Sequence, residues 1–183
     1  MRTPTRILTS DRLMLRRFRP DDLDWLDRLN GDPQVMRYLG GPAPRADTEA
    51  MLSGRILAYY EQCPGLGVWA TIERASGACV GFHLINHIRG EASVQVGYRL
   101  FPAFWGRGYA TEMTRVLLQY GFADLALPKI VAMTHLDNRE SQHVLLKSGL
   151  RRDGERRLTH PAYAEGALAW FERRREDWLA AAG

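Results

Sequence analysis

Residues 104–112 read FWGRGYATE, and the two glycines in this stretch lie between a strand-like run and a helix-like run. Residues 93–100 are a strand-like run that follows a turn signal at 89–90, and apolar residues recur at helical spacing over 111–123. The first N–H groups of a helix have no partner within it and carry the positive end of its dipole. Glycines at 106 and 108 leave such groups open to an anion.

Taken alone, this glycine turn is consistent with phosphate binding or with a simple corner. The dinucleotide-binding fingerprint needs a third glycine where the chain has Thr111, and the P-loop needs a Gly-Lys-Ser/Thr sequence that is absent. The turn therefore matches neither of these nucleotide motifs, and its meaning depends on the rest of the chain.

The remaining segments alternate between strand-like and helix-like patterns, without a repeat or a low-complexity tract, which indicates an α+β fold. Turn residues at 76–77 and 89–90 predict an antiparallel meander in the middle of the chain. The strands expected besides 93–100 are 12–18, 68–74, 80–88, 129–134, 150–158 and 167–171. The helices expected besides 111–123 are 20–30, a short one from 32, 47–62, 138–149 with Asn138 as its cap, and 174–181.

Composition and charge narrow the functional class. The chain has 183 residues and a formal charge of +4, and acidic residues interrupt its densest basic runs, which argues against a nucleic-acid-binding stripe. It contains no apolar run of the roughly 20 residues that cross a bilayer, and its first residues do not resemble a secretory signal. The only cysteines, Cys63 and Cys79, do not form a disulfide framework, so we expect a cytoplasmic protein without membrane contact.

Longer stretches around the glycine turn carry a family resemblance. The run VGYRLFPAFWGRGYATEMTRVLLQYGF at 96–122, followed by DNRESQHVLLKSGLRRDGE at 137–155, resembles the Gcn5-related N-acetyltransferase (GNAT) superfamily. Residues 10–39 and 167–178 resemble its Rim-type branch, the ribosomal-protein N-acetyltransferases, so the likeness covers nearly the whole chain. The resemblance implies one GNAT domain over residues 1–183. Its sheet would be mixed but mostly antiparallel, with about seven strands, splayed between the fourth and fifth and flanked by helices.

This resemblance implies acyl transfer from acetyl-CoA, the expected co-substrate, to an amine. The family turn reads Gln/Arg-x-x-Gly-x-Gly/Ala; Gly108 and Ala110 match its last two fixed positions, and Trp105 departs from the first. The family fold then implies that CoA contacts the turn, the edge of the preceding strand and the following helix. The residues concerned are Gly106, Arg107, Gly108, Tyr109, Ala110 and Thr111 for the pyrophosphate, Tyr98, Leu100 and Phe101 for the pantetheine, and Asn138 and Ser141 near the thiol.

The usual acid and base of the family are missing. The position of the common glutamate base is Gln95, and that of the common tyrosine acid is Leu145. A free α-amine has a pKa of about 8, against about 10.4 for lysine, so part of it is already neutral at pH 7. We therefore expect catalysis to rest on positioning, on backbone N–H groups that stabilise the oxyanion, and on Ser141 as a hydrogen-bond partner of the thiol. His135 is the first alternative base.

Several other readings stay open at this point. Tyr38, Trp69 and Gln95 are candidates for the acceptor site, although core packing explains the two aromatic residues equally well. The acceptor could be a protein N-terminus or a small amine, and the protein a monomer or a homodimer. Loss of the usual acid and base also allows a CoA-binding module without catalysis. No metal is expected, because Cys79, His83 and His87 are spaced along a strand, too far apart to share one ion.

Overall fold

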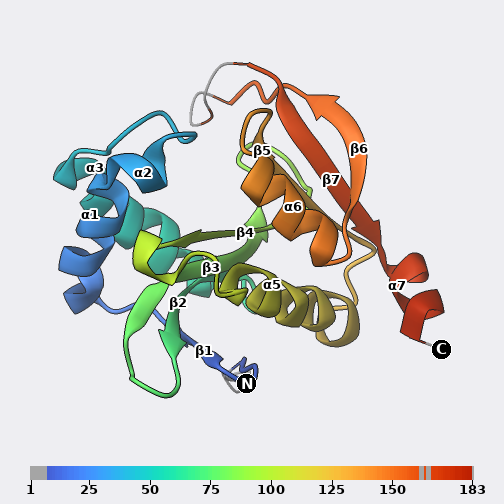
Figure 1. The fold of residues 1–183 in the computed structure, drawn as a ribbon, viewed down its shortest axis with the longest axis horizontal. Coiled ribbons are helices and arrows are strands. Elements are labelled where there is room, and N and C mark those ends of the chain that lie inside the picture. Colours follow the sequence, from blue (N-terminus) through green and yellow to red (C-terminus); the bar gives the residue numbers. More distant parts are fainter. Residues whose placement is uncertain (1–7, 161–162, 164–165, 183) are drawn as a thin grey trace.

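A computed structural model describes residues 8–160, 163 and 166–182, and its centre is a seven-stranded sheet (Figure 1). The spatial order of the strands is β1-β2-β3-β4-β5-β7-β6. The expected strands and their number are confirmed, with ends shifted by no more than a few residues. The strands are β1 (Leu13–Arg17), β2 (Gly67–Glu73), β3 (Cys79–His87), β4 (Val94–Leu100), β5 (Lys129–His135), β6 (Arg151–Arg156) and β7 (Leu168–Arg174).

The sheet opens between its fourth and fifth strands. β1 to β4 pair antiparallel in sequence order, as the turn signals predicted, and β7 pairs antiparallel with β5 and with β6. β4 and β5 run parallel and share a single register pair, Gln95 with Val131. Beyond Gln95 the last five residues of β4 have no partner in β5, so the expected splay is present.

Helical segments connect and cover the strands. Helix α5 begins at Tyr109, two residues before the expected start at 111, because Gly108 adopts a left-handed conformation with φ of 80° and serves as the N-cap. The segment expected at 47–62 is helical from Arg45 through α3, η2 and α4. The elements are η1 (Pro20–Asp22), α1 (Leu23–Gly31), α2 (Pro33–Met36), α3 (Arg45–Ala50), η2 (Met51–Leu57), α4 (Tyr59–Gln62), η3 (Pro102–Phe104), α5 (Tyr109–Gln119), η4 (Tyr120–Asp124), α6 (Arg139–Lys147) and α7 (Arg175–Ala182).

Two apolar clusters fill the two faces of the sheet. Alternate residues of β4, such as Val96 and Leu100, pack with Met113 and Leu117 of α5 in the larger cluster. The other cluster joins α1 and η2 to the opposite face. Figure 1 shows α5 and α6 side by side in front of the sheet and α1 to α3 at its other side. Because strand side chains alternate between faces, Gln95 and Arg99 of β4 point toward the face that α1 and η2 cover, opposite α5.

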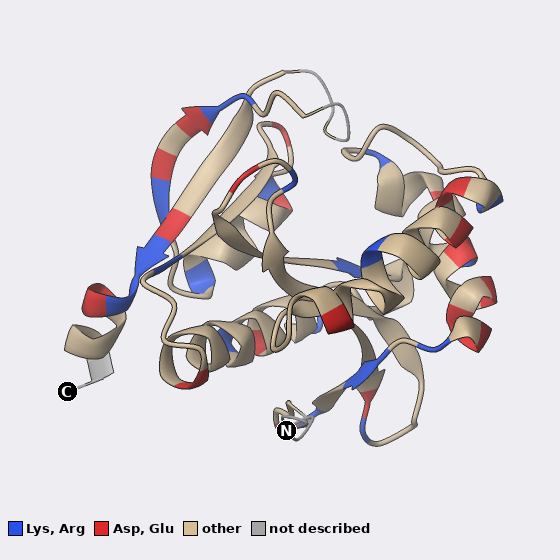
Figure 2. Ribbon diagram, turned by 180° about the vertical axis from the view of Figure 1, so that it is seen from behind, with Lys and Arg blue, Asp and Glu red and all other residues tan. Residues whose placement is uncertain are grey.

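Charged side chains are spread over the surface rather than gathered into one basic stripe. Figure 2 shows acidic residues on α1 and its neighbours and both signs interleaved along β6. Within residues 8–160 and 166–182, no helix combines the length and the apolar character that crossing a bilayer requires.

Candidate active site

The glycine turn presents an open, positively polarised helix end. Gly106 and Gly108 have φ of 72° and 80°, in the left-handed region that other residues rarely adopt. A Cβ atom on Gly106 would meet nothing within 4 Å, so the space in front of the helix is free. Glu112 makes the first intrahelical hydrogen bond, from its N–H to the Gly108 oxygen at 3.0 Å. The amides of the residues before it have no helical acceptor and could bind an oxyanion.

Two arginines flank this turn, and both are already paired. Arg107 lies 3.8 Å from Glu73 and stacks on the ring of Phe104. Arg12 lies over the Tyr109 ring and brings Nη2 to 3.5 Å from the Cβ position of Gly108. Sequence reasoning missed Arg12, because it lies just before β1, far from the turn along the chain.

Glu112 links α5 to the N-terminal segment. Its Oε1 accepts hydrogen bonds from the hydroxyl of Ser10 at 2.6 Å and from the N–H of Arg12 at 3.1 Å. Its Oε2 accepts from Nε of Arg12 at 2.7 Å. Burial opposes ionisation of this carboxyl, but the bonds from Ser10 and Arg12 outweigh it and lower its pKa. The carboxylate thereby holds Arg12 beside the turn.

The side chains of Tyr109 and Trp105 both make hydrogen bonds within the protein. Tyr109 is 6% exposed and donates its hydroxyl proton to Glu73. Trp105 donates its indole N–H to the Leu100 oxygen at 2.8 Å. Phe101 donates its own N–H to Val80 at 3.0 Å. The Phe101 oxygen in turn accepts the Phe104 N–H at 2.9 Å. Of the backbone polar groups of Leu100 and Phe101, the Leu100 N–H is therefore the one left to serve a pantetheine arm.

Tyr98 and Ser141 meet at the opening between β4 and β5. The Tyr98 hydroxyl donates to Ser141 Oγ at 3.1 Å, and burial raises the pKa of Tyr98 to about 12. Asn138 is the N-cap of α6, as expected, and its Oδ1 accepts the Ser141 N–H at 3.1 Å. The structure thus brings three predicted residues together. It also supplies a hydrogen bond between two side chains, Tyr98 and Ser141, that the sequence did not indicate.

His83 lies behind Tyr98 and cannot act as a base near neutral pH. Its ring is fully buried, lies 5.8 Å from the ring of Tyr98, and shares a 2.7 Å hydrogen bond with Thr71. Burial lowers the pKa of His83 to about 3, so the imidazole stays neutral. As expected, His83 lies in a strand, β3, together with Cys79 and His87, so the three residues are spaced along an extended chain.

Gln95 and Leu145 stand where the family commonly has its base and its acid. The Gln95 amide donates to Asn86 Oδ1 at 3.1 Å, on the face of β4 opposite α5. Leu145 is 2% exposed and belongs to the core cluster beneath α5. Neither position therefore offers a group that can accept or release a proton.

Tyr38 and His135 come together beside the opening. Their rings are stacked, with centroids 5.3 Å apart, although one follows α2 and the other ends β5. His135 Nδ1 accepts the N–H of Asp137 at 3.1 Å. Trp69 is not brought to this group. It lies in β2, two strands away from β4, where it packs against Tyr60 and touches both core clusters.

Comparison with known proteins identifies the family. A family model described as an acetyltransferase (GNAT) domain matches residues 12–151, which is more than half of the chain. The chain belongs to the GNAT family. An uncharacterised N-acetyltransferase of Bacillus subtilis (strain 168), YoaA, is 30% identical over 153 residues, which cover 81% of this chain and 84% of that protein. The chain is an N-acetyltransferase with acetyl-CoA as co-substrate, as its sequence motifs predicted.

Solved structures of GNAT proteins share the fold. An acetyltransferase from Agrobacterium tumefaciens str. C58 superposes with a TM-score of 0.80 at 24% identity, over 95% of this chain and 97% of that one. A spermidine N-acetyltransferase from Vibrio cholerae, in complex with CoA and spermine, superposes with a TM-score of 0.72 at 16% identity, over 92% and 98% of the two chains. These likenesses show that the chain shares its fold with both proteins.

Proposed function

We propose that CoA binds along the opening between β4 and β5, with its pyrophosphate at the start of α5 and its thiol end near Ser141. The observation that carries this proposal is the alignment of two features on one side of the sheet. One is the unobstructed glycine turn, whose free amides suit a diphosphate. The other is the Tyr98–Ser141 pair on the same face as α5. Both lie where β4 lacks a strand partner, which is where an extended arm could replace one.

Acetyl-CoA supplies an activated acetyl group, which a primary amine takes by direct attack on the thioester. The amine would approach from the opposite face, beside Gln95, where β4 and β5 part. Backbone N–H groups of β4 past this point are available to stabilise negative charge that develops on the carbonyl oxygen. Ser141 accepts a hydrogen bond from Tyr98, so its own hydroxyl proton is free to point toward the sulfur. Tyr98 thus orients Ser141.

The attacking amine would arrive already neutral, without a strong base on the enzyme. The pKa of Tyr98, about 12, is too high for a base at neutral pH, and that of His83, about 3, is too low. Gln95 cannot take a proton at all. Weakly basic amines, such as a protein N-terminal α-amine or a small amine of similar pKa, therefore suit this site best. His135 is the alternative base, and its stacking on Tyr38 leaves it beside the proposed approach path.

Release of free thiol from acetyl-CoA tests this function over a panel of peptides with free N-termini, lysine side chains and small amines. We expect kcat/KM to rise about tenfold per pH unit below the pKa of the acceptor amine, and to level off above it. Changing to an amine of different pKa should move the profile by the same amount. Binding of acetyl-CoA with no turnover for any amine would instead favour a CoA-binding module. An ionisation that disappears in His135→Gln would identify His135 as the base.

Two further properties are part of the proposal. The free thiols of Cys63 and Cys79 are compatible with a reducing cytoplasm. The protein would act as a single domain, either as a monomer or as a homodimer, which size-exclusion chromatography with light scattering distinguishes.

A further inference from the structure

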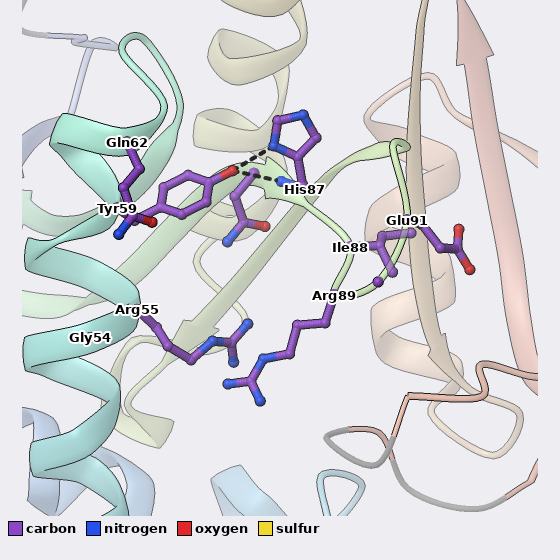
Figure 3. Close-up of a pocket in the computed structure, with 10 residues that line it drawn as sticks. Gly54, Arg55, Tyr59, Gln62, His87, Ile88, Arg89 and Glu91 are labelled. Atoms are coloured by element: carbon purple, nitrogen blue, oxygen red, sulfur yellow. Dashed lines mark hydrogen bonds between the residues drawn. The ribbon is translucent and has the colours of Figure 1, made fainter.

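A pocket of about 460 Å³ lies between η2 and the hairpin that joins β3 to β4 (Figure 3). Pockets of this size hold small molecules. Arg55 enters it from η2, and Arg89 enters it from the hairpin. Figure 3 shows the two guanidinium groups pointing into the same space, whereas the Glu91 carboxylate is turned away from them.

These two arginines face each other without a counter-charge. In the part of the chain that the structure describes, neither has a carboxylate within ion-pair distance. Although Arg55 as a whole is exposed, desolvation and repulsion from Arg89 together lower its pKa to about 10. Burial also lowers the pKa of Arg89. Two cations in one partly dry pocket repel each other, and an anion between them would remove that cost.

Other arginines nearby do find acids, so the pair is not simply a result of an arginine-rich composition. Arg45 on α3 lies 2.7 Å from Asp24 and 3.1 Å from Asp27. Arg16 on β1 makes two bonds of 2.7 Å to Asp22. Arg55 and Arg89 differ from these arginines because they line a pocket and have no carboxylate partner among residues 8–160, 163 and 166–182.

The pocket is connected to the place where the amine is proposed to react. Asn86, one of its lining residues, accepts the hydrogen bond from Gln95. Asn86 also pairs with Gln95 across the sheet, and Arg89 lies three residues farther along the same chain. Three extended residues span about 10 Å. A small molecule could therefore place an amine near Gln95 and another group between the arginines.

Hydrogen bonds hold the walls of the pocket in place. The Tyr59 hydroxyl accepts the His87 N–H at 3.0 Å and shares a 2.8 Å bond with His87 Nδ1, which ties α4 to the end of β3. The N–H of Arg89 donates to the Tyr163 hydroxyl at 2.9 Å. The two arginines thus project from anchored backbone, which reduces the entropy lost when they bind a ligand.

We propose that the acceptor is a small amine that also carries an oxyanion, a carboxylate or a phosphate, bound by Arg55 and Arg89. Arginine suits this role because its planar fork binds such groups with two parallel hydrogen bonds. The same pair of charges disfavours polyamines, the class named for the Vibrio cholerae neighbour. The inference rests on the proposed acetyl transfer and specifies its substrate class.

The test compares amines that differ only in the anionic group. A series of ω-amino acids of increasing chain length is assayed by thiol release, together with the matching amides, aminoalkyl phosphates and spermidine. The rate is expressed per neutral amine, so that differences in amine pKa between the compounds cancel. We then expect each acid or phosphate to exceed its neutral partner in kcat/KM by about 10- to 100-fold, the range for hydrogen bonds to a charged group. The best chain length reports the distance between the two subsites, and the ratio of acid to phosphate tells which oxyanion is preferred.

Variants of the arginines should remove this preference. Arg55→Gln and Arg89→Gln should each lower kcat/KM for the anionic acceptor about 10- to 100-fold and leave the amide unchanged. Arg89→Glu should raise the relative use of spermidine, and Arg151→Gln on exposed β6 is the matched control. Acetyl-CoA affinity measured by calorimetry shows that each variant is folded.

Equal use of acid and amide by the wild-type protein, or equal losses on both in the variants, would overturn the inference while leaving acetyl transfer intact. A wild-type protein that acetylates no amine in the panel would instead overturn the proposed function itself. The two failures are therefore distinguishable.

Discussion

The proposed CoA side and the proposed acceptor side of this enzyme would bind anions by different means. At the glycine turn, the flanking cations Arg12 and Arg107 are neutralised by Glu112 and Glu73, and backbone amides are left to meet the ligand. At the proposed acceptor pocket the N–H groups of His87 and Arg89 already donate to Tyr59 and Tyr163, and neither of the pocket's two arginines has a carboxylate partner among the described residues. The proposed CoA side thus relies on backbone groups, which suit a ligand that does not vary. The other depends on side chains, which evolution can exchange to change the substrate.

The largest expected effect tests the backbone side. Gly106→Val would put a β-branched residue into a left-handed conformation and a side chain into the space before α5. Loss of about two charge-assisted hydrogen bonds, roughly 3 kcal/mol, predicts a fall of about 100-fold in acetyl-CoA affinity, measured by calorimetry.

Gly154→Val is the matched control, since Gly154 has φ of 77° and a Cβ there would also meet nothing within 4 Å. Both variants should lose about 1–2 kcal/mol of unfolding free energy through backbone strain. Equal acetyl-CoA affinity in the two variants would show that the turn does not bind the cofactor.

A smaller effect is expected where the two sides meet. Ser141→Ala should lower kcat about 10- to 100-fold, because it removes a hydrogen bond to a sulfur that becomes charged. Tyr98→Phe should lower kcat only about fivefold, since it removes a neutral bond that orients Ser141.

Ser148→Ala provides the control on the same helix, where the hydroxyl donates to the Val144 oxygen at 2.8 Å. It should alter stability and leave kcat unchanged. If kcat fell more in Tyr98→Phe than in Ser141→Ala, Tyr98 rather than Ser141 would be the group that contacts the sulfur. That result would contradict the proposal that Tyr98 only orients Ser141.

The smallest effect concerns the acceptor side. Tyr38→Ala should raise KM for the acceptor about fivefold, because an aromatic stack contributes about 0.5–1.5 kcal/mol, and it should leave KM for acetyl-CoA unchanged. Tyr38→Phe keeps the ring and should behave as wild type. If Tyr38→Ala changed only the KM for acetyl-CoA, the Tyr38–His135 pair would belong to the cofactor side. The proposed separation of the CoA side from the acceptor side would then be wrong at this pair.

Much of the framework could be predicted because it depends on neighbouring residues. Alternating side chains identified the strands, and Asn138 was correctly expected to cap α6, where it accepts the Ser141 N–H. The start of α5 was expected too late, since nothing in the sequence indicated that Gly108, rather than Ala110, would be the last non-helical residue. Trp69 was ambiguous between the core and the site, because an aromatic residue in a strand fits either environment.

The sequence by itself determined the α+β order, the glycine turn and the absence of the usual acid and base at Gln95 and Leu145. Tertiary structure alone decided which charges are neutralised. It pairs Arg12 with Glu112 and leaves Arg55 facing Arg89. The physical reason is that secondary structure follows from local sterics and hydrogen bonding. The energy of a charge depends instead on distance through space and on exclusion of water, both of which are set only when distant segments pack together.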